Sequence, residues 1–127
     1  MLIDLFFLVA PETTEVMYGA DNIIDKHMKS FSEVKYCLDG CCDSAGPSLV
    51  ITTEPIRKGL KELTKRGIST WYIININKGN FSYCKMMIED GHQLRHLRGI
   101  KSNFAIFDRL EYTANFVIEE GKPITLS

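Results

Sequence analysis

A helical pattern that leads directly into an apolar run is the feature of this sequence that most constrains its fold. Residues 53–67 have the spacing of an amphipathic helix, with a capping threonine at the start and a glycine at the end. Residues 68–76 (ISTWYIINI) follow at once and are nearly continuous in β-branched and aromatic side chains. Such a run is typical of a central strand covered on both faces. We therefore expect Trp71 and Ile73 to be largely buried in the middle of a sheet.

The other patterns along the chain place this helix and strand in an alternating order. Apolar residues at helical spacing or in alternation predict further elements at 18–31 (helix), 33–39 (strand), 81–88 (helix), 103–107 and 111–118 (two strands joined by a short turn). This order predicts an α/β fold with a mixed, mostly parallel sheet, helices on both faces and a C-terminal β-hairpin. All 127 residues fit one domain.

Residues 1–13 form an apolar leader. Its segment 2–10 (LIDLFFLVA) is far shorter than the ~20 residues of a membrane span, and it lacks the basic start of a secretory signal. We expect no membrane span. The leader must bury its side chains against its own domain or against a dimer mate, and we expect a homodimer formed through it.

Charge and cysteine usage restrict the partners. Fifteen basic and sixteen acidic residues give a net charge of −1, which argues against nucleic acid as a partner. The four cysteines, Cys37, Cys41, Cys42 and Cys84, have no regular framework spacing, so we expect free thiols in the cytoplasm. Only half of a zinc-ligand pattern is present, so neither a metal nor another cofactor is expected.

The common catalytic motifs are absent from the sequence. There is no phosphate-binding loop, no dinucleotide glycine fingerprint and no serine nucleophile elbow. We therefore expect that this chain is not an enzyme.

Residues 52–68 (TTEPIRKGLKELTKRGI), a loop and helix leading into an apolar strand, resemble the first half of a phospholipase D-like domain. Catalysis in that superfamily uses a histidine nucleophile in the motif H-x-K-x4-D. Alignment of Lys101 with the motif lysine puts Gly99 at the histidine and Ile106 at the aspartate, and Asp108 is out of register. The resemblance therefore implies at most a degenerate or divergent phosphodiesterase.

A closer resemblance covers nearly all of the chain after residue 13. The motifs at 14–19 (TEVMYG), 54–58 (EPIRK), 65–68 (KRGI), 80–85 (NFSYCK) and 94–104 (LRHLRGIKSNF) are similar to the amino-terminal region of archaeal, particularly thaumarchaeal, sensor histidine kinases. The last motif commonly reads RHLDGIKGNF there, so Arg98 and Ser102 depart from it. The resemblance implies a non-catalytic sensory input domain of a two-component system, with a kinase transmitter domain elsewhere in the parent protein.

Ligands of open α/β sheets bind beyond the carboxyl ends of the strands. Here the corresponding loops are residues 39–48 and 75–80. The candidate ligand contacts in and beside these loops are Cys37, Asp39, Asn75, Asn77 and Asn80. A basic group near the hairpin, suited to an anion, adds Arg95, His96 and Lys101. Ordinary loop capping and a solvated charged turn are the alternatives for these two groups.

Three functions remain open from the sequence. The preferred reading is a ligand-binding input domain of a histidine-kinase-type protein, whose signal the sequence does not name. The first alternative is the degenerate phospholipase D-like phosphodiesterase. The second is the effector-binding domain of a transcription regulator, which would require an attached DNA-binding module.

Overall fold

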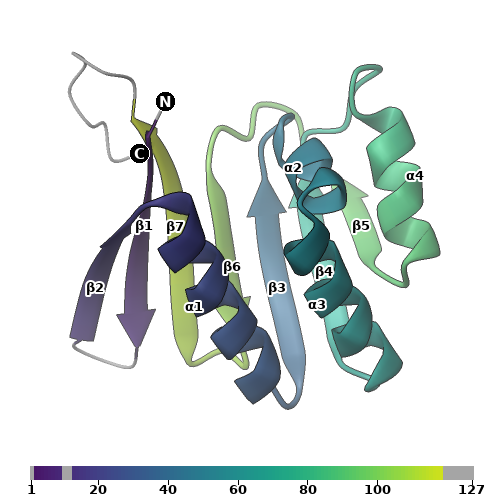
Figure 1. Ribbon diagram of the computed structural model, residues 1–127. Helices are drawn as coiled ribbons and strands as arrows, with labels where there is room; N and C mark the ends of the chain where they lie inside the picture. The colour runs from purple at the N-terminus through teal and green to yellow at the C-terminus, as the bar shows by residue number, and fades with distance from the viewer. Residues whose placement is uncertain (1, 10–12, 119–127) are drawn as a thin grey trace.

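The computed structural model describes residues 2–9 and 13–118, and within these ranges seven strands form one sheet with four helices (Figure 1). In chain order the elements are β1 (Leu2–Val9), β2 (Thr13–Tyr18), α1 (Ala20–Glu33), β3 (Cys37–Cys42), α2 (Gly46–Thr52), α3 (Glu54–Lys65), β4 (Ser69–Ile74), α4 (Phe81–Glu89), β5 (Gln93–His96), β6 (Asn103–Phe107) and β7 (Glu111–Ile118). The strand order across the sheet is β2-β1-β7-β6-β3-β4-β5.

The sheet confirms the predicted α/β class, its mixed character and the C-terminal hairpin of β6 and β7. It is not mostly parallel, however. Only β3–β4 and β4–β5 pair in parallel, whereas β1–β2, β1–β7, β6–β7 and β3–β6 pair antiparallel. The difference arises because the leader contributes a hairpin of its own, and because the C-terminal hairpin is inserted between that hairpin and β3.

The helices cover one face of the sheet rather than both faces. In Figure 1 they lie in front of the strands, and their buried side chains share one core cluster, which includes Phe31 of α1, Leu63 of α3 and Met87 of α4. The connections β2-α1-β3, β3-α2-α3-β4 and β4-α4-β5 all advance across the sheet in the same direction. Crossovers between parallel strands are nearly always right-handed, so three crossovers in one direction place their helices on one face.

The burial of β4 follows from this arrangement. Thr70, Tyr72 and Ile74 face the helices and are buried, whereas Trp71 is 36% exposed and Ile73 is 44% exposed. The prediction that Trp71 and Ile73 are largely buried is therefore wrong. The expected position in the middle of the sheet is wrong as well, because β4 lies beside the edge strand β5. An apolar run indicates a strand with neighbours on both sides, but it does not indicate whether anything covers its second face.

The leader lies inside the sheet of its own chain. β1 pairs with β2 on one side and with β7 on the other, so that Phe6 stands opposite both Val16 and Ala114. Its backbone is therefore paired within its own chain, as expected for a leader that packs against its own domain, and the dimer contact through its side chains stays a prediction. Positions 1 and 10–12 of the predicted leader lie outside the described residues. Within the described ranges, no helix is both long and apolar enough to cross a membrane.

Ile74 is fully buried at the carboxyl end of β4, and Ile88 on α4 is 57% exposed, which makes them a matched pair. We predict that Ile74→Ala lowers the free energy of unfolding by about 2–5 kcal/mol, because it empties a packed aliphatic site. Ile88→Ala should change it by no more than about 0.5 kcal/mol. Urea unfolding of the two variants measures both values, and equal losses would contradict the assignment of the covered face.

Candidate functional site

The turn between β4 and α4 is built on two asparagines that cap each other. The backbone N–H of Asn77 donates to Oδ1 of Asn80 at 2.9 Å, and the backbone N–H of Asn80 donates to Oδ1 of Asn77 at 3.0 Å. Asparagine favours such turns because its side chain reaches the backbone two or three residues away. The reciprocal pair fixes the path of the chain from the end of β4 to Phe81, the first residue of α4.

Asn80 also connects this turn to the loop that follows β3. Its side chain is only 3% exposed. The Nδ2 group donates to the carbonyl oxygens of Asn75 at 2.9 Å and Ser44 at 3.0 Å. Both loops at the carboxyl ends of β3 and β4 are therefore held by one buried amide.

His96 supports the same turn from the neighbouring strand. It ends β5 opposite Ile74, and its Nδ1 accepts the backbone N–H of Ile76 at 3.0 Å. Beside this contact, an open hollow of about 380 Å³ is lined by Ile76, Asn77, Lys78 and Phe81. Phe81 is 58% exposed, and the hollow combines its apolar side chain with the ammonium group of Lys78.

The structure brings together half of the predicted site residues. Asn75, Asn77, Asn80 and His96 lie at the carboxyl end of β4, around the hollow. Lys101 is exposed in the connection from β5 to β6, which crosses the sheet at that same end because Phe104 pairs with Cys41 near the end of β3.

The other predicted residues lie elsewhere. Asp39 stands in the middle of β3, and Arg95 extends over the ring of Trp71, with its guanidinium carbon 5.5 Å from the ring centre. Cys37 begins β3 and is therefore at the opposite end of the sheet. The sequence argument placed it too close to the site because the predicted strand ended at residue 39, whereas β3 continues to Cys42. In the described part of the chain, no three His, Cys, Asp or Glu side chains are grouped to hold a metal ion.

Sequence reasoning missed Lys78 and Phe81, which supply the charge and the ring of the hollow. Phe81 lies at helical spacing with Cys84 and Ile88, and we expected this whole stripe to be apolar core. Only Cys84 and Met87 of α4 are buried. Spacing indicates the side of a helix that faces the core, but it does not show that the first turn extends past the core, and no other sequence signal does.

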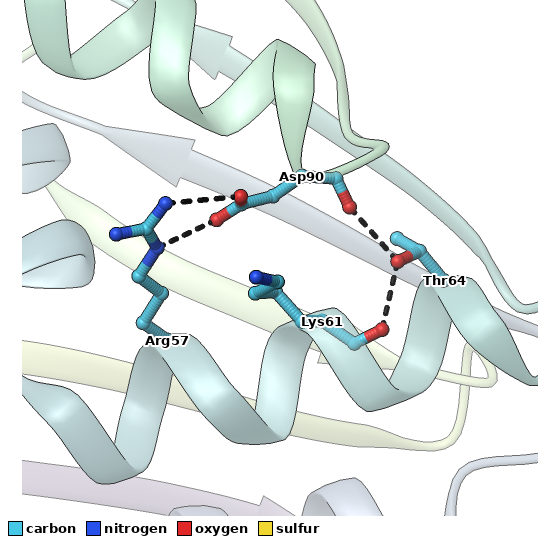
Figure 2. Close-up of polar contacts among 4 residues, drawn as sticks. All are labelled: Arg57, Lys61, Thr64 and Asp90. Atoms are coloured by element: carbon cyan, nitrogen blue, oxygen red, sulfur yellow. Dashed lines mark hydrogen bonds and ion pairs between the residues drawn. The ribbon is translucent and has the colours of Figure 1, made fainter.

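The carboxyl end of α4 is fixed to α3 by polar contacts of Asp90 (Figure 2). Nε and Nη2 of Arg57 donate to the two carboxylate oxygens of Asp90 at 2.9 and 3.1 Å. The Thr64 hydroxyl is shared between the carbonyl oxygens of Asp90 at 2.9 Å and Lys61 at 2.8 Å. The hydrogen bonds from Arg57 lower the pKa of Asp90 below its ordinary value. Arg57 therefore links α3 to the end of α4.

Lys101 and Asp108, the two residues considered in the phospholipase D-like alignment, lie far from each other in the structure. Asp108 follows β6, where it accepts the backbone N–H groups of Lys35, Tyr36 and Cys37 at 2.8, 2.7 and 3.0 Å. Burial raises the pKa of Asp108, but these three donors outweigh that effect and lower it. Lys101 precedes β6, so the length of that strand, about 17 Å for five residues, separates the two side chains.

Comparison with known proteins gives only distant similarity, to solved structures. No family model matches the chain, and no curated protein matches it. Among solved structures, the chain is similar to TrmBL2, described as an archaeal chromatin protein with a novel mode of DNA binding. The identity is 14% and the TM-score is 0.49, over 87% of this chain and 42% of TrmBL2. The chain thus spans less than half the length of that protein.

This finding corrects the functional interpretation of the sequence. The similar protein is a DNA-binding chromatin protein, so we withdraw the histidine-kinase input domain, its kinase transmitter partner and the exclusion of nucleic acid. The exclusion rested on a net charge of −1, and a net charge does not show where cations gather. Arg95, Arg98 and Lys101 are all exposed within one short segment. A similarity this distant transfers no activity to the chain.

Replacing Asn80 tests its part in the site. We predict that Asn80→Ala lowers the free energy of unfolding by about 1–3 kcal/mol, because partly buried carbonyl and N–H groups lose their partner. The control is Asn22→Ala, which removes an exposed amide that donates to the Tyr18 carbonyl at 3.0 Å. It should cost no more than about 0.5 kcal/mol. Urea unfolding measures both free energies. If Asn80→Ala loses as little stability as the control, Asn80 does not hold the two loops.

The ion pair of Asp90 predicts a pH dependence. Because its pKa is lowered in the folded protein, the pair stabilises the fold above the unfolded pKa of about 4 and this stabilisation is lost as the pH falls through the folded pKa. Asp90→Asn should therefore be less stable at neutral pH, and its free energy of unfolding should fall less steeply from about pH 5 downward.

Glu62→Gln is the matched control for this measurement, since Glu62 forms a solvent-exposed pair with Lys65 at 3.5 Å and such pairs contribute little. Unfolding of the three proteins across the acid range provides the comparison. Parallel profiles for the wild type and Asp90→Asn would contradict the assigned role of the ion pair.

Proposed function

We propose that this chain is the effector-binding domain of a transcription regulator and that it binds a small anionic effector without transforming it. The observation that carries the proposal is the hollow at the carboxyl end of β4, which both Lys78 and Phe81 line. The effector should have an anionic group for the ammonium of Lys78 and a ring or apolar body for Phe81. Phosphorylated metabolites and organic acids belong to this class.

The geometry of the hollow supports this proposal in two ways. Its volume of about 380 Å³ lies within the usual range for small-molecule sites, and its wall is formed by Ile76 and Phe81 around a few polar groups. It also lies where α4 begins, and the first N–H groups of a helix have no partner within the helix. An anion placed there meets both these donors and the positive end of the helix dipole.

The hydrogen bonds of Asn80 support a regulatory role. An effector bound against Asn77 and Phe81 presses on the turn whose position Asn80 fixes. The same side chain holds the Ser44 carbonyl, and residue 46 begins α2. Binding at the hollow is therefore coupled to the loop after β3. In a transcription regulator, such a coupled movement is passed to an attached DNA-binding module.

Two further points favour a binding domain over an enzyme. Lys101 and Asp108 lie at opposite ends of β6, which disfavours the phosphodiesterase alternative. All four cysteines are free, and burial raises the pKa of the Cys42 thiol to about 12, so it stays protonated.

Free thiols are typical of a reducing compartment, and we place the protein in the cytoplasm.

A thermal unfolding screen tests the proposal. The chain is heated with inorganic phosphate, citrate, sugar phosphates or nucleoside monophosphates in the absence of DNA. We expect at least one of these compounds to raise the midpoint by several degrees, because a ligand that binds only the folded state stabilises it. Lys78→Ala and Phe81→Ala should each abolish the shift.

Matched controls lie on exposed side chains remote from the hollow. Lys58→Ala on α3 removes another exposed ammonium, and Leu110→Ala in the β6–β7 turn removes another exposed apolar side chain. Both should keep the full shift. A shift that persists in Lys78→Ala and Phe81→Ala, or no shift with any compound, would refute the site. Turnover of a phosphodiester that Lys101→Ala abolishes would refute the non-catalytic role.

A further inference from the structure

The face of the sheet opposite the helices presents an apolar surface. We call it the open face and define it by Asp39, Trp71, Ile73, Arg95, Phe104 and Ile106. The strand registers place these residues on one side, because Asp39 is opposite both Trp71 and Ile106, and Ile73 is opposite Arg95. Across residues 2–9 and 13–118, the helices lie on the other side of the sheet (Figure 1).

The centre of the open face is unusually apolar for a solvent-facing surface. Trp71 and Ile73 alternate with the buried residues of β4 and are 36% and 44% exposed. Next to them, across β3, lie Phe104 and Ile106 of β6. Each square ångström of apolar surface left in water costs about 25 cal/mol, and contiguous apolar patches usually mark an interaction surface.

Charges of opposite sign flank this centre. Arg95 comes from β5, and its guanidinium carbon lies 5.5 Å from the centre of the Trp71 ring. Asp39 comes from β3, on the other side of β4, and stands level with Trp71 in the strand register. Trp71 is thus placed between a carboxylate on one neighbouring strand and a guanidinium on the other.

This charge arrangement is complementary to itself. A two-fold axis that runs parallel to β4, in front of the open face, places β3 of one copy over β5 of the other. Asp39 then faces Arg95 of the second copy, and the symmetric pair forms at the same time. Trp71 and Ile73 of both copies meet at the centre. Aromatic residues and arginine are enriched in the cores of such interfaces.

We propose that the open face binds a second copy of this chain in a two-fold, face-to-face contact. This inference goes beyond effector binding and does not depend on it. Nucleic acid suits the open face less well, because Asp39 would repel its phosphates. A contact through sheet faces also differs from the leader contact expected from the sequence, because it uses strands β3 to β5.

Sedimentation of charge-exchange variants tests the contact. We expect the wild type to sediment as a dimer at tens of micromolar. Asp39→Arg places two arginines opposite each other in both pairs, and Arg95→Asp places two aspartates there, so each variant alone should sediment as a monomer. An equimolar mixture should sediment as a dimer again, because each Arg then faces an Asp across the axis.

The mixture separates an interface from an effect within one chain, since loss of an Asp39–Arg95 attraction inside the same chain would not be repaired by mixing. Glu62→Arg on the exposed side of α3 is the control and should remain a dimer. A monomeric wild type, dimeric single variants, or folded variants whose mixture stays monomeric would each overturn the proposal. The last result would favour a segment of another protein as the occupant of the open face.

Trp71 gives a second measurement that needs no variant, because it is the only tryptophan of the chain. Its emission should move to shorter wavelength as the wild-type protein is concentrated through the monomer–dimer transition, since the contact removes water from the indole ring. This result decides the question if either charge variant fails to fold. A dimer that forms without any change in Trp71 emission would overturn the proposal.

Discussion

The handedness of three chain crossovers determines most of what this protein presents to its surroundings. Each helical connection joins parallel strands and advances across the sheet in the same direction, so right-handed crossovers place all the helices on one face. One face of the sheet then becomes the wall of the core, and the other remains a surface. The position of the hollow follows from the same geometry, because the last of these crossovers brings the first turn of α4 to the carboxyl end of β4.

Residues 68–76 illustrate how far sequence reasoning reaches. Their side chains correctly indicate a strand, since strand formation depends on local preferences, but they do not give its place in the sheet, because β4 lies beside the edge strand β5 and not in the middle. They do not indicate which side is covered, because coverage depends on the direction of connections elsewhere in the chain. The leader is similar: its apolar character requires burial, but its strand partners are set by β7, where Leu2 pairs with Ile118 near the other end of the chain. Long-range pairing of this kind has no local signal.

The residues of the candidate site also separate into those that a local pattern predicts and those whose role depends on packing elsewhere in the chain. Asn75, Asn77 and Asn80 were predictable because turn-forming asparagines after a strand act over a few residues. His96 was assigned to a basic group near the hairpin, and it lies beside the turn instead because it ends β5 opposite Ile74. Lys78 and Phe81 were not predictable, since their role depends on where the core ends beneath α4. The error at Cys37 has a different cause. The strand was predicted to end at residue 39, three residues too early, and this moved Cys37 close to a site from which the length of β3 separates it.

The strand β5 has a consequence for how the sheet can grow. It is the edge strand beside β4, it has only four residues, and exposed Arg95 and His96 form its second half. A strand from another molecule that added there would find few backbone partners and would bring its own side chains against a cation. This edge of the sheet therefore resists extension in its own plane, which limits fibre-like association through β5.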